Sequence, residues 1–265
     1  VVRLVGSEMC IRDRLQLLEL KQIEENLFLG ENEPENGARI FGGQVLAQAS
    51  MAAYRTVADL DVHSMHAYFL RPGDSSKRVL YEVERIRDGR SFTTRRVVAI
   101  QSGQAIFNMD VSFQGVEPGL DHSLPMPNVP LPTELQEDRA VAIKLGGAKA
   151  DPRLSPMAKI ERPFELRSVF ELGTSAWAEA RDWNPAWVRF LAPVEEAAGL
   201  SQPISRCLLA YASDMGLVST GHLPHQQEIN RTQLQMASLD HSLWIHRPVP
   251  ILSLIHISEP TRRTT

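Results

Sequence analysis

The residue best suited to catalysis in this sequence is an aspartate within an apolar segment. Asp214 lies in the stretch from Cys207 to Met215, part of a helix that composition and spacing predict. Burial of a carboxylate costs several kcal/mol unless it is hydrogen-bonded or paired. The residues alone leave two interpretations. In the first, Asp214 lies on the solvent-exposed edge of the helix or near its end. In the second, it is a general base that deprotonates a water molecule.

A second group of polar residues, Ser238, Asp240 and His241, lies on a segment that predicts a long strand from Gln233 to His246. Alternation puts Ser238 and Asp240 on one face of this strand and His241 on the other. A Ser-His-Asp triad needs the histidine between the other two residues. The sequence also contains no Gly-x-Ser-x-Gly nucleophile turn. Ser238 is therefore interpreted either as a structural hydroxyl or as a partner of a bound water molecule.

The start of another predicted helix carries the word Gly42-Gly43-Gln44. Glycines permit a close approach of neighbouring groups, and backbone N–H groups at a helix start can face an oxygen atom. This motif indicates either tight packing of the helix on a sheet or contact with a substrate carbonyl.

Two arginines and a serine surround the turn Asp88-Gly89. Arg87, Arg90 and Ser91 are either exposed polar residues or contacts for a phosphate group.

The histidines His63 and His66 share one predicted strand, where alternation puts them on opposite faces. We expect core or interface residues there rather than a pair of metal ligands. No metal and no cofactor is expected elsewhere.

The composition excludes several classes of protein. The 265 residues carry 28 Lys plus Arg against 32 Asp plus Glu, a net charge of −4 that argues against a nucleic-acid partner. No apolar run reaches the roughly 18 residues that a membrane helix needs, so no membrane partner is expected. The two cysteines, Cys10 and Cys207, lack the spacing of a metal site and cannot form a disulfide framework. A reducing compartment, the cytoplasm, fits this pattern.

The two ends of the chain have an unusual relation. Codons for Met9 to Asp13, extended by one codon and read from the complementary strand in a shifted frame, give Leu252 to His256. Residues 1–14 and 252–265 therefore resemble translations of one sequencing adapter. We expect both ends to lie outside the folded core, which leaves residues 15–251 as the native segment.

The remaining pattern predicts elements that would position these residues. Residues 15–30 predict a short amphipathic helix, and residues 45–57 predict an Ala-rich helix packed on a sheet. Four strands joined by turn sequences predict an antiparallel meander of hairpins, at His63–Leu70, Val79–Ile86, Phe92–Gln101 and Ala105–Phe113. After a Pro-rich linker at 116–163, the second half predicts strands at Phe164–Phe170 and Trp187–Leu191 and a helix at Ile204–Val218.

The second half of the sequence repeats the order of elements of the first half. Both halves also carry a motif that begins with His-Ser and ends in Arg-Pro, at 63–72 and at 241–248. An Ala-rich helix wrapped by a curved antiparallel sheet, present twice, resembles the double hotdog of the acyl-CoA thioesterase II family. The words that carry the resemblance are Ile-Phe-Gly-Gly-Gln-Val at 40–45, His-x-x-Phe-Leu-Arg-Pro-Gly-Asp at 66–74, Arg-Asp-Gly-Arg-Ser-Phe at 87–92, Tyr-Ala-Ser-Asp at 211–214 and Leu-Asp-His-Ser-Leu-Trp at 239–244.

The resemblance implies an α+β fold with two hotdog units. The first would span residues 15–115 and the second residues 164–251, with the linker at 116–163 between them. The second unit would be incomplete, because a later strand of the family's second hotdog would lie beyond Ile251.

The resemblance also implies the chemistry, which is hydrolysis of fatty acyl-CoA to fatty acid and CoA. Asp214 would activate water, and Ser238, where the family usually has threonine, would hold that water. The family's third catalytic residue, a glutamine, would lie beyond Ile251, so the chain as given is expected to be a poor enzyme. Gly42, Gly43 and Gln44 would contact the thioester or pantetheine.

Arg90 and Ser91 would also contact the substrate, at the CoA phosphates. The full-length protein is expected to be a homo-oligomer that needs no metal or cofactor. Two alternatives remain: a non-catalytic acyl-CoA-binding double hotdog and a hotdog enoyl-CoA hydratase, although the short hydratase word is not found.

Overall fold

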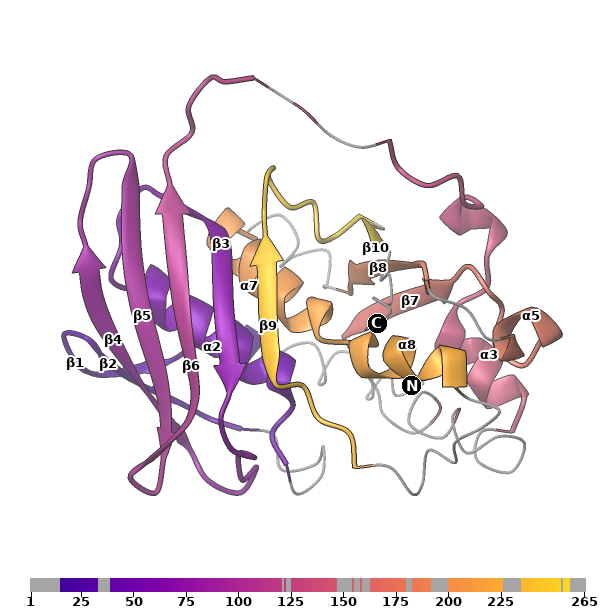
Figure 1. Ribbon diagram of the computed structural model, residues 1–265, viewed down its shortest axis with the longest axis horizontal. Helices are drawn as coiled ribbons and strands as arrows, with labels where there is room; N and C mark the ends of the chain where they lie inside the picture. Colours follow the sequence, from indigo (N-terminus) through magenta and orange to yellow (C-terminus); the bar gives the residue numbers. More distant parts are fainter. Residues whose placement is uncertain are drawn as a thin grey trace, which may run out of the picture.

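The computed structural model describes residues 15–32, 39–120, 122, 125–146, 154, 158, 163–179, 183–191, 200–225, 235–253 and 255–257. The expectation for residues 1–14 lies outside this range. Within the described part, the first sheet has seven strands, at Lys21–Glu24 (β1), Leu27–Gly30 (β2), Asp61–Phe69 (β3), Val79–Arg87 (β4), Phe92–Gln101 (β5), Gln104–Gln114 (β6) and Asp240–Trp244 (β9). Their spatial order is β1-β2-β4-β5-β6-β3-β9 (Figure 1).

This sheet wraps around the helix α2, Gly42–Tyr54. Side chains on β5 alternate between buried and outward positions, as Val97 and Ala99 show on the buried face. Residues 43–54 of α2 are all buried. The predicted Ala-rich helix is therefore confirmed, because the small side chains of Ala49 and Ala52, both 0 % exposed, let its backbone approach the sheet closely.

The predicted meander is wrong at its first connection. β4, β5 and β6 follow one another as hairpins, but β3 pairs with β6 instead of β4. The chain after β3 thus crosses to the far side of the hairpin pair. Turn residues such as Arg71-Pro72-Gly73-Asp74 predict that the chain turns, but they do not fix which strand becomes its neighbour.

The predicted helix at 15–30 is also wrong, because this segment contains the hairpin of β1 and β2. The strands are joined at Glu25 and Asn26, and both residues hold Arg85 of β4, through an ion pair of 3.1 Å and a hydrogen bond of 2.9 Å. Phe28 of β2 is completely buried. Pairing with β4 and burial of Phe28 outweigh the weak helical spacing of the leucines.

The second half forms a smaller sheet and a second long helix. Its strands are Phe164–Ser168 (β7), Ala186–Phe190 (β8) and Ile255–Ile257 (β10), in the order β10-β8-β7. The helix α7 spans Gln202–Ser213 and is followed by the short helix α8, Leu217–His222. In the linker, the helix α3, Asp138–Lys144, packs its own small apolar cluster with Leu154 and Leu172. None of the helices in the described ranges has the length and apolar character needed to cross a membrane.

The expected exclusion of residues 252–265 from the core is wrong for the part of this segment that is described. Leu252 and Ile255 pack against the main apolar core, and β10 pairs with β8. Pairing of backbone groups makes few demands on side chains, and the alternation in Leu-Ile-His-Ile suits a strand. A segment of this pattern can therefore complete a sheet edge whatever its origin.

The predicted long strand at 233–246 is shorter and lies in a different sheet. Residues 235–239 are irregular, the strand β9 begins only at Asp240, and it pairs with β3 of the first sheet. Residues 233 and 234 lie outside the described residues. The two halves of the chain therefore share one sheet.

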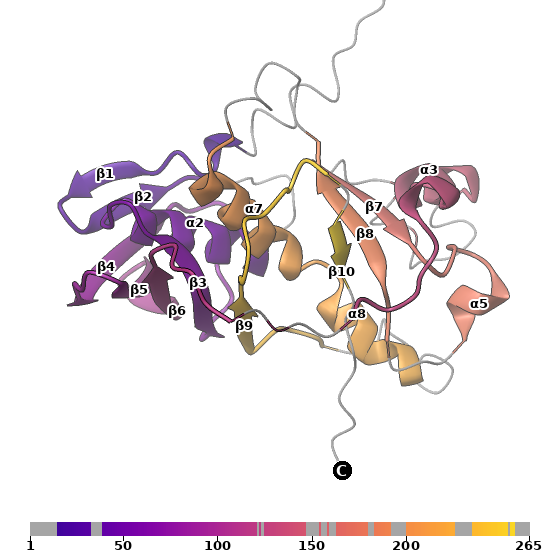
Figure 2. The ribbon, with the colours of Figure 1, turned by 90° about the horizontal axis from the view of Figure 1, so that it is seen from above.

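The helices α2 and α7 lie side by side and run in opposite directions. Figure 2 shows α7 between α2 and the small sheet. At one end, Gly43 in the first turn of α2 lies against the carbonyl of Tyr211 near the end of α7. At the other end, the guanidinium of Arg206 in α7 donates to the carbonyl of Val62, after α2 has ended. The C-terminus of α7 therefore meets the N-terminus of α2.

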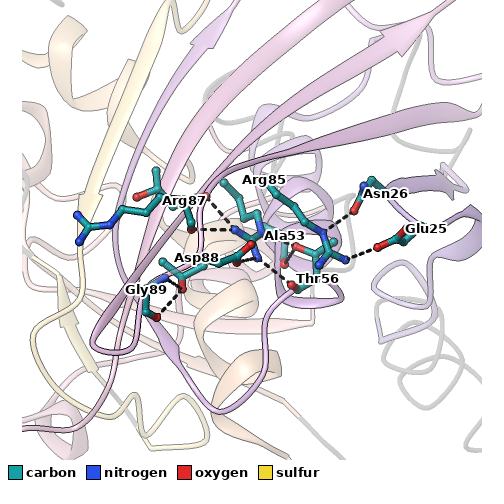
Figure 3. A network of polar contacts seen from close by, with 11 residues as sticks. Glu25, Asn26, Ala53, Thr56, Arg85, Arg87, Asp88 and Gly89 are labelled. Carbon is teal, nitrogen blue, oxygen red and sulfur yellow. Dashed lines mark hydrogen bonds and ion pairs between the residues drawn. The ribbon is translucent and has the colours of Figure 1, made fainter.

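A buried arginine fixes the far end of α2, and Figure 3 shows its partners Thr56, Arg87 and Asp88. Arg95 of β5 is 1 % exposed, and each of its five N–H donors has an acceptor. Nε donates to the Thr56 hydroxyl at 2.8 Å, and Nη2 donates to the Thr56 carbonyl at 3.0 Å and to Asp88. Nη1 donates to the carbonyls of Arg87 and Thr94 at 3.1 and 3.0 Å. This fork joins the β4–β5 turn to the chain that leaves α2.

We expect Arg95→Lys to destabilise the protein by about 2–4 kcal/mol, because lysine offers three donors from a single atom and leaves buried acceptors unpaired. Urea unfolding measures this change. Arg96→Lys is the matched control, since Arg96 is half-exposed on the same strand and pairs with Asp110 at 2.8 Å. It should leave the unfolding midpoint almost unchanged. Equal midpoints for the two variants would contradict the role given to the fork.

Candidate active site

The carboxylate of Asp214 lies at the meeting point of the two long helices. Asp214 is the C-cap residue of α7 and is 9 % exposed. It borders a cavity of about 470 Å³. The apolar walls of this cavity come from the start of α2, the ends of β3 and β6, and the segment before β9, and they include Ile40, Phe41, Val45, Phe69, Ile106, Phe107, Met236 and Leu239. A buried acidic group therefore borders a largely apolar space of the size of a small-molecule site.

Two donors among the described residues hold the Asp214 carboxylate. The hydroxyl of Ser238 donates to Oδ1 at 3.2 Å, and the backbone N–H of Gly43 donates to the same carboxyl group. Burial raises the pKa of Asp214 above its ordinary value, and the bonds from Ser238 and Gly43 oppose that rise. The result is an oriented carboxylate with an increased affinity for a proton, which is the property of a general base.

The glycines at the start of α2 make this arrangement possible. A Cβ atom on Gly42 would lie 2.6 Å from Oδ2 of Asp214 and 3.0 Å from the ring of Phe69. A Cβ atom on Gly43 would lie closer to the Tyr211 carbonyl oxygen than real Cβ atoms approach. Close packing, one of the two interpretations of these glycines, therefore occurs, and the oxygen that Gly43 contacts belongs to Asp214. Contact of the glycines with a substrate carbonyl stays a prediction.

Gln44 faces away from the cavity. Its side-chain Nε2 donates to Oδ1 of Asn32 at 2.7 Å, and its backbone N–H donates to the Phe41 carbonyl at 3.1 Å. Gln44 is 3 % exposed and does not line the cavity beside Asp214. In the structure Gln44 thus holds the segment after β2 against α2, and its predicted contact with substrate stays a prediction.

Arg90 and Ser91 lie at the opposite end of α2 from Asp214. Arg90 borders a separate cavity of about 370 Å³, together with Thr56, Asp59 and Arg95. The 13 residues of α2 span about 20 Å, so these side chains and Asp214 are not brought together.

His241 is a member of the site that the sequence pattern assigns to the wrong place. Its imidazole is buried, with Nε2 2.9 Å from the Ser213 hydroxyl and Nδ1 3.9 Å from Oδ1 of Asp214. Alternation predicts Ser238 and His241 on opposite faces, but Ser238 precedes the strand and its direction is independent of the pleat. Both residues therefore converge on Asp214, whose carboxylate lies between the hydroxyl and the imidazole.

The histidines of β3 share the outer face of the sheet, in contrast to the predicted opposite faces. A β-bulge just before Ser64 shifts the register and turns His63 outward, where its Nε2 lies 2.8 Å from the Ser112 hydroxyl. His66 is exposed, with Nδ1 3.1 Å from the Ser242 hydroxyl. In the part of the chain that the structure describes, no cluster of His, Cys, Asp and Glu is arranged to hold a metal ion.

Two family models match the chain. The model described as acyl-CoA thioesterase N-terminal domain matches residues 32–114, and the model described as acyl-CoA thioesterase matches residues 182–259. The first match covers α2 and the strands β3 to β6, and the second covers Asp214, Ser238 and His241.

Individual proteins give the same result. Acyl-CoA thioesterase 2 of Haemophilus influenzae is 35% identical over 243 residues, which cover 90% of this chain and 82% of that protein. Acyl-coenzyme A thioesterase 8 of Homo sapiens is 36% identical over 242 residues, covering 88% of this chain and 73% of that protein. Among solved structures, acyl-CoA thioesterase II TesB2 from Mycobacterium marinum has a TM-score of 0.74 at 30% identity and covers 95% of this chain and 87% of that one.

A hot dog fold protein from Alicyclobacillus acidocaldarius supports the fold alone, with a TM-score of 0.67 at 17% identity over 91% of this chain and 81% of that one. The predicted α+β double hotdog is therefore confirmed. The observations on sequence, fold and site agree, and the chain belongs to the acyl-CoA thioesterase family.

Proposed function

We propose that this protein hydrolyses fatty acyl-CoA to free fatty acid and CoA with Asp214 as the general base. The observation that carries the proposal is the buried Asp214 carboxylate, oriented by Ser238 and Gly43 at the wall of an apolar cavity of about 470 Å³. The similarity to acyl-CoA thioesterases over most of the chain supports this substrate class. The acyl-CoA-binding and enoyl-CoA hydratase alternatives are not favoured.

In the proposed reaction, Asp214 takes a proton from a water molecule whose oxygen attacks the thioester carbonyl carbon. The amide of Gly42, at the positive end of the α2 dipole and on the cavity wall, would stabilise the negative charge that develops on the carbonyl oxygen. The carbon–sulfur bond then breaks, and the CoA sulfur receives the proton from Asp214. The products are the acid and free CoA, and the carboxylate is restored.

The cavity suggests how the two parts of the substrate would lie. Its apolar residues, such as Phe69, Ile106 and Leu239, suit an acyl chain, while Arg39 and Arg71 on the same wall suit anionic groups of CoA. A CoA phosphate contact by Arg90 and Ser91 stays a prediction, since both lie at the other end of α2. Replacing Arg90 would test it through KM.

Several finer proposals accompany this function. We place residues 15–115 and 164–251 in two hotdog units and residues 116–163 in the linker. A role in fatty acid metabolism follows from the proposed substrate, and a cytoplasmic location is supported by the free, buried thiol of Cys207. A homo-oligomer is supported by the exposed aromatic side chains of Tyr68 and Trp244 on the outer face of the large sheet.

The experiment that tests this proposal compares Ser238→Ala with Ser238→Thr. Alanine removes a donor that lowers the pKa of Asp214, so the acid limb of the pH–rate profile should move to higher pH and turnover should fall about tenfold, the equivalent of one hydrogen bond. Threonine keeps the hydroxyl and should retain turnover within about twofold. Release of free thiol from octanoyl- and palmitoyl-CoA measures both effects.

Ser242→Ala is the matched control, because Ser242 lies on β9 but contacts His66 on the outer face of the sheet. It should behave as the wild type. Absence of thiol release from any acyl-CoA by the wild-type chain would count against the proposed function. Full activity of Ser238→Ala would exclude the hydroxyl from the mechanism.

A further inference from the structure

The imidazole of His241 is held in one tautomer by its neighbours. The Ser213 hydroxyl has a single hydrogen, which it donates to the Ala210 carbonyl at 2.9 Å. With that hydrogen engaged, the oxygen of the hydroxyl, 2.9 Å from Nε2 of His241, is left to accept a hydrogen bond from the ring. This arrangement places the ring proton on Nε2 and leaves a lone pair on Nδ1.

That lone pair faces the catalytic carboxylate. Nδ1 of His241 is buried, has no hydrogen-bond partner among the described residues, and lies 3.9 Å from Oδ1 of Asp214. Burial lowers the pKa of His241, which favours the neutral form of the ring. An ionised carboxylate and an imidazole lone pair are both acceptors, so they cannot bond to each other. They become complementary when Asp214 carries a proton.

We propose that His241 is a positioning residue whose Nδ1 accepts a hydrogen bond from Asp214 once that carboxylate has taken a proton from the attacking water. The proton stays on Asp214 and remains available to the leaving sulfur, and His241 itself is not protonated. Ser213 takes part by fixing the tautomer. This inference rests on the proposed role of Asp214 as the base, and it assigns a function to a buried polar atom that the fold alone leaves unpaired.

Few other charged groups face this pair. Asp214 comes from α7, and Asp240 on the histidine's own strand raises the pKa of His241 against the effect of burial. Arg39 and Arg71 lie on the wall of the cavity that Asp214 borders. From β3, the residue opposite His241 is Ala67, which carries no charge.

The test measures the titration of the Asp214 carboxyl carbon by NMR in the full chain. His241→Gln can keep the bond to Ser213 through its amide but lacks the acceptor that faces Asp214. Ser213→Ala keeps the imidazole but frees the tautomer, so that an Nδ1–H can face the carboxylate. Both variants should lower the pKa of Asp214, and turnover of acyl-CoA should fall about tenfold in each, the equivalent of one hydrogen bond.

The control is His66→Gln, because His66 lies on the outer face of β3, where it contacts Ser242. Its carboxyl titration and turnover should equal those of the wild type. The titration reports on Asp214 whether or not the chain hydrolyses acyl-CoA, so a failure of the proposed function would be recognised separately. Should His241→Gln fail to fold, Ser213→Ala decides. An unchanged Asp214 titration in Ser213→Ala would overturn the proposal.

Discussion

Replacing Asp214 with asparagine is expected to lower acyl-CoA turnover by at least about a hundredfold, the usual minimum contribution of a positioned base, while raising thermal stability at neutral pH. Asparagine has nearly the same shape but does not accept a proton from water. Its amide can still accept the hydrogen bond from Ser238, so the fold should be retained. Release of free thiol and thermal unfolding measure the two effects.

The stability effect follows from the direction of the pKa shift. Burial raises the pKa of Asp214 in the folded protein above its unfolded value. The contribution of such a group to stability is fully present below the unfolded pKa and is lost as the pH rises through the folded pKa. Asparagine is neutral at every pH and avoids that loss. The gain in Tm should therefore be present at pH 7 and absent at about pH 3, below the ordinary range of a carboxyl group.

Asp240→Asn is the matched control, because Asp240 is an exposed carboxylate at the start of β9. It should leave turnover almost unchanged and should not produce the gain in Tm at pH 7 that is expected for Asp214→Asn. An active Asp214→Asn variant would remove Asp214 from the mechanism. A gain in Tm of equal size at both pH values would show that the charge is not its cause.

The second large effect is expected for Gly43→Ala. The new methyl group would meet the carbonyl oxygen of Tyr211, and a backbone atom cannot rotate away. Relief of this overlap requires α2 and α7 to move apart, at a cost of about 1–3 kcal/mol. The same movement draws the residue-43 N–H away from Asp214, so turnover should fall by at least about tenfold, since a hydrogen bond to a charged group is lost.

Two other glycines provide comparisons for this variant. Gly42→Ala should affect turnover more than stability, because its obstacles are the side chains of Asp214 and Phe69, which can move. Gly115→Ala should be neutral, since its nearest neighbour would lie 3.4 Å away, on Leu60. Urea unfolding and thiol release distinguish the three. Wild-type stability and turnover in Gly43→Ala would show that the helices tolerate a wider separation.

The elements that the sequence predicts well are those set by local patterns. β5 occupies the predicted range, Phe92–Gln101, and β4 extends one residue beyond its predicted end. Alternating side chains and the turns Asp88-Gly89 and Ser102-Gly103 determine these hairpins, and Ser102 and Gly103 both adopt positive φ. The pairing of β3 with β6 is decided by packing around α2, which a local pattern does not describe.

In the candidate site, too, local sequence patterns predict some features, while contacts between distant elements decide others. The predicted helix at Ile204–Val218 is wrong at its end, because α7 stops at Ser213 and α8 begins only at Leu217, with Gly216 at positive φ between them. The close approach of the glycines to Asp214 follows from residue type. The direction of Gln44 depends on Asn32, a residue of a different element, and the approach of His241 depends on where β9 begins. The prediction that Ser238 and His241 lie on opposite faces assumed that both belong to one strand. Because β9 starts two residues after Ser238, the alternation of side chains does not extend to Ser238.

The pairing of β9 with β3 has a consequence for the order in which the protein folds. His66 and Ser242, which lie opposite each other in this pair, are separated by 176 residues of chain. Contacts at such a separation form slowly, because the loop between them must be closed first. During synthesis, β3 would remain an open sheet edge until β9 leaves the ribosome. His241 lies on β9 and Ser238 just before it, so the same late event that protects this edge brings both residues to Asp214 and assembles the candidate catalytic group. If these residues act as proposed, the appearance of activity would report the closing of the sheet.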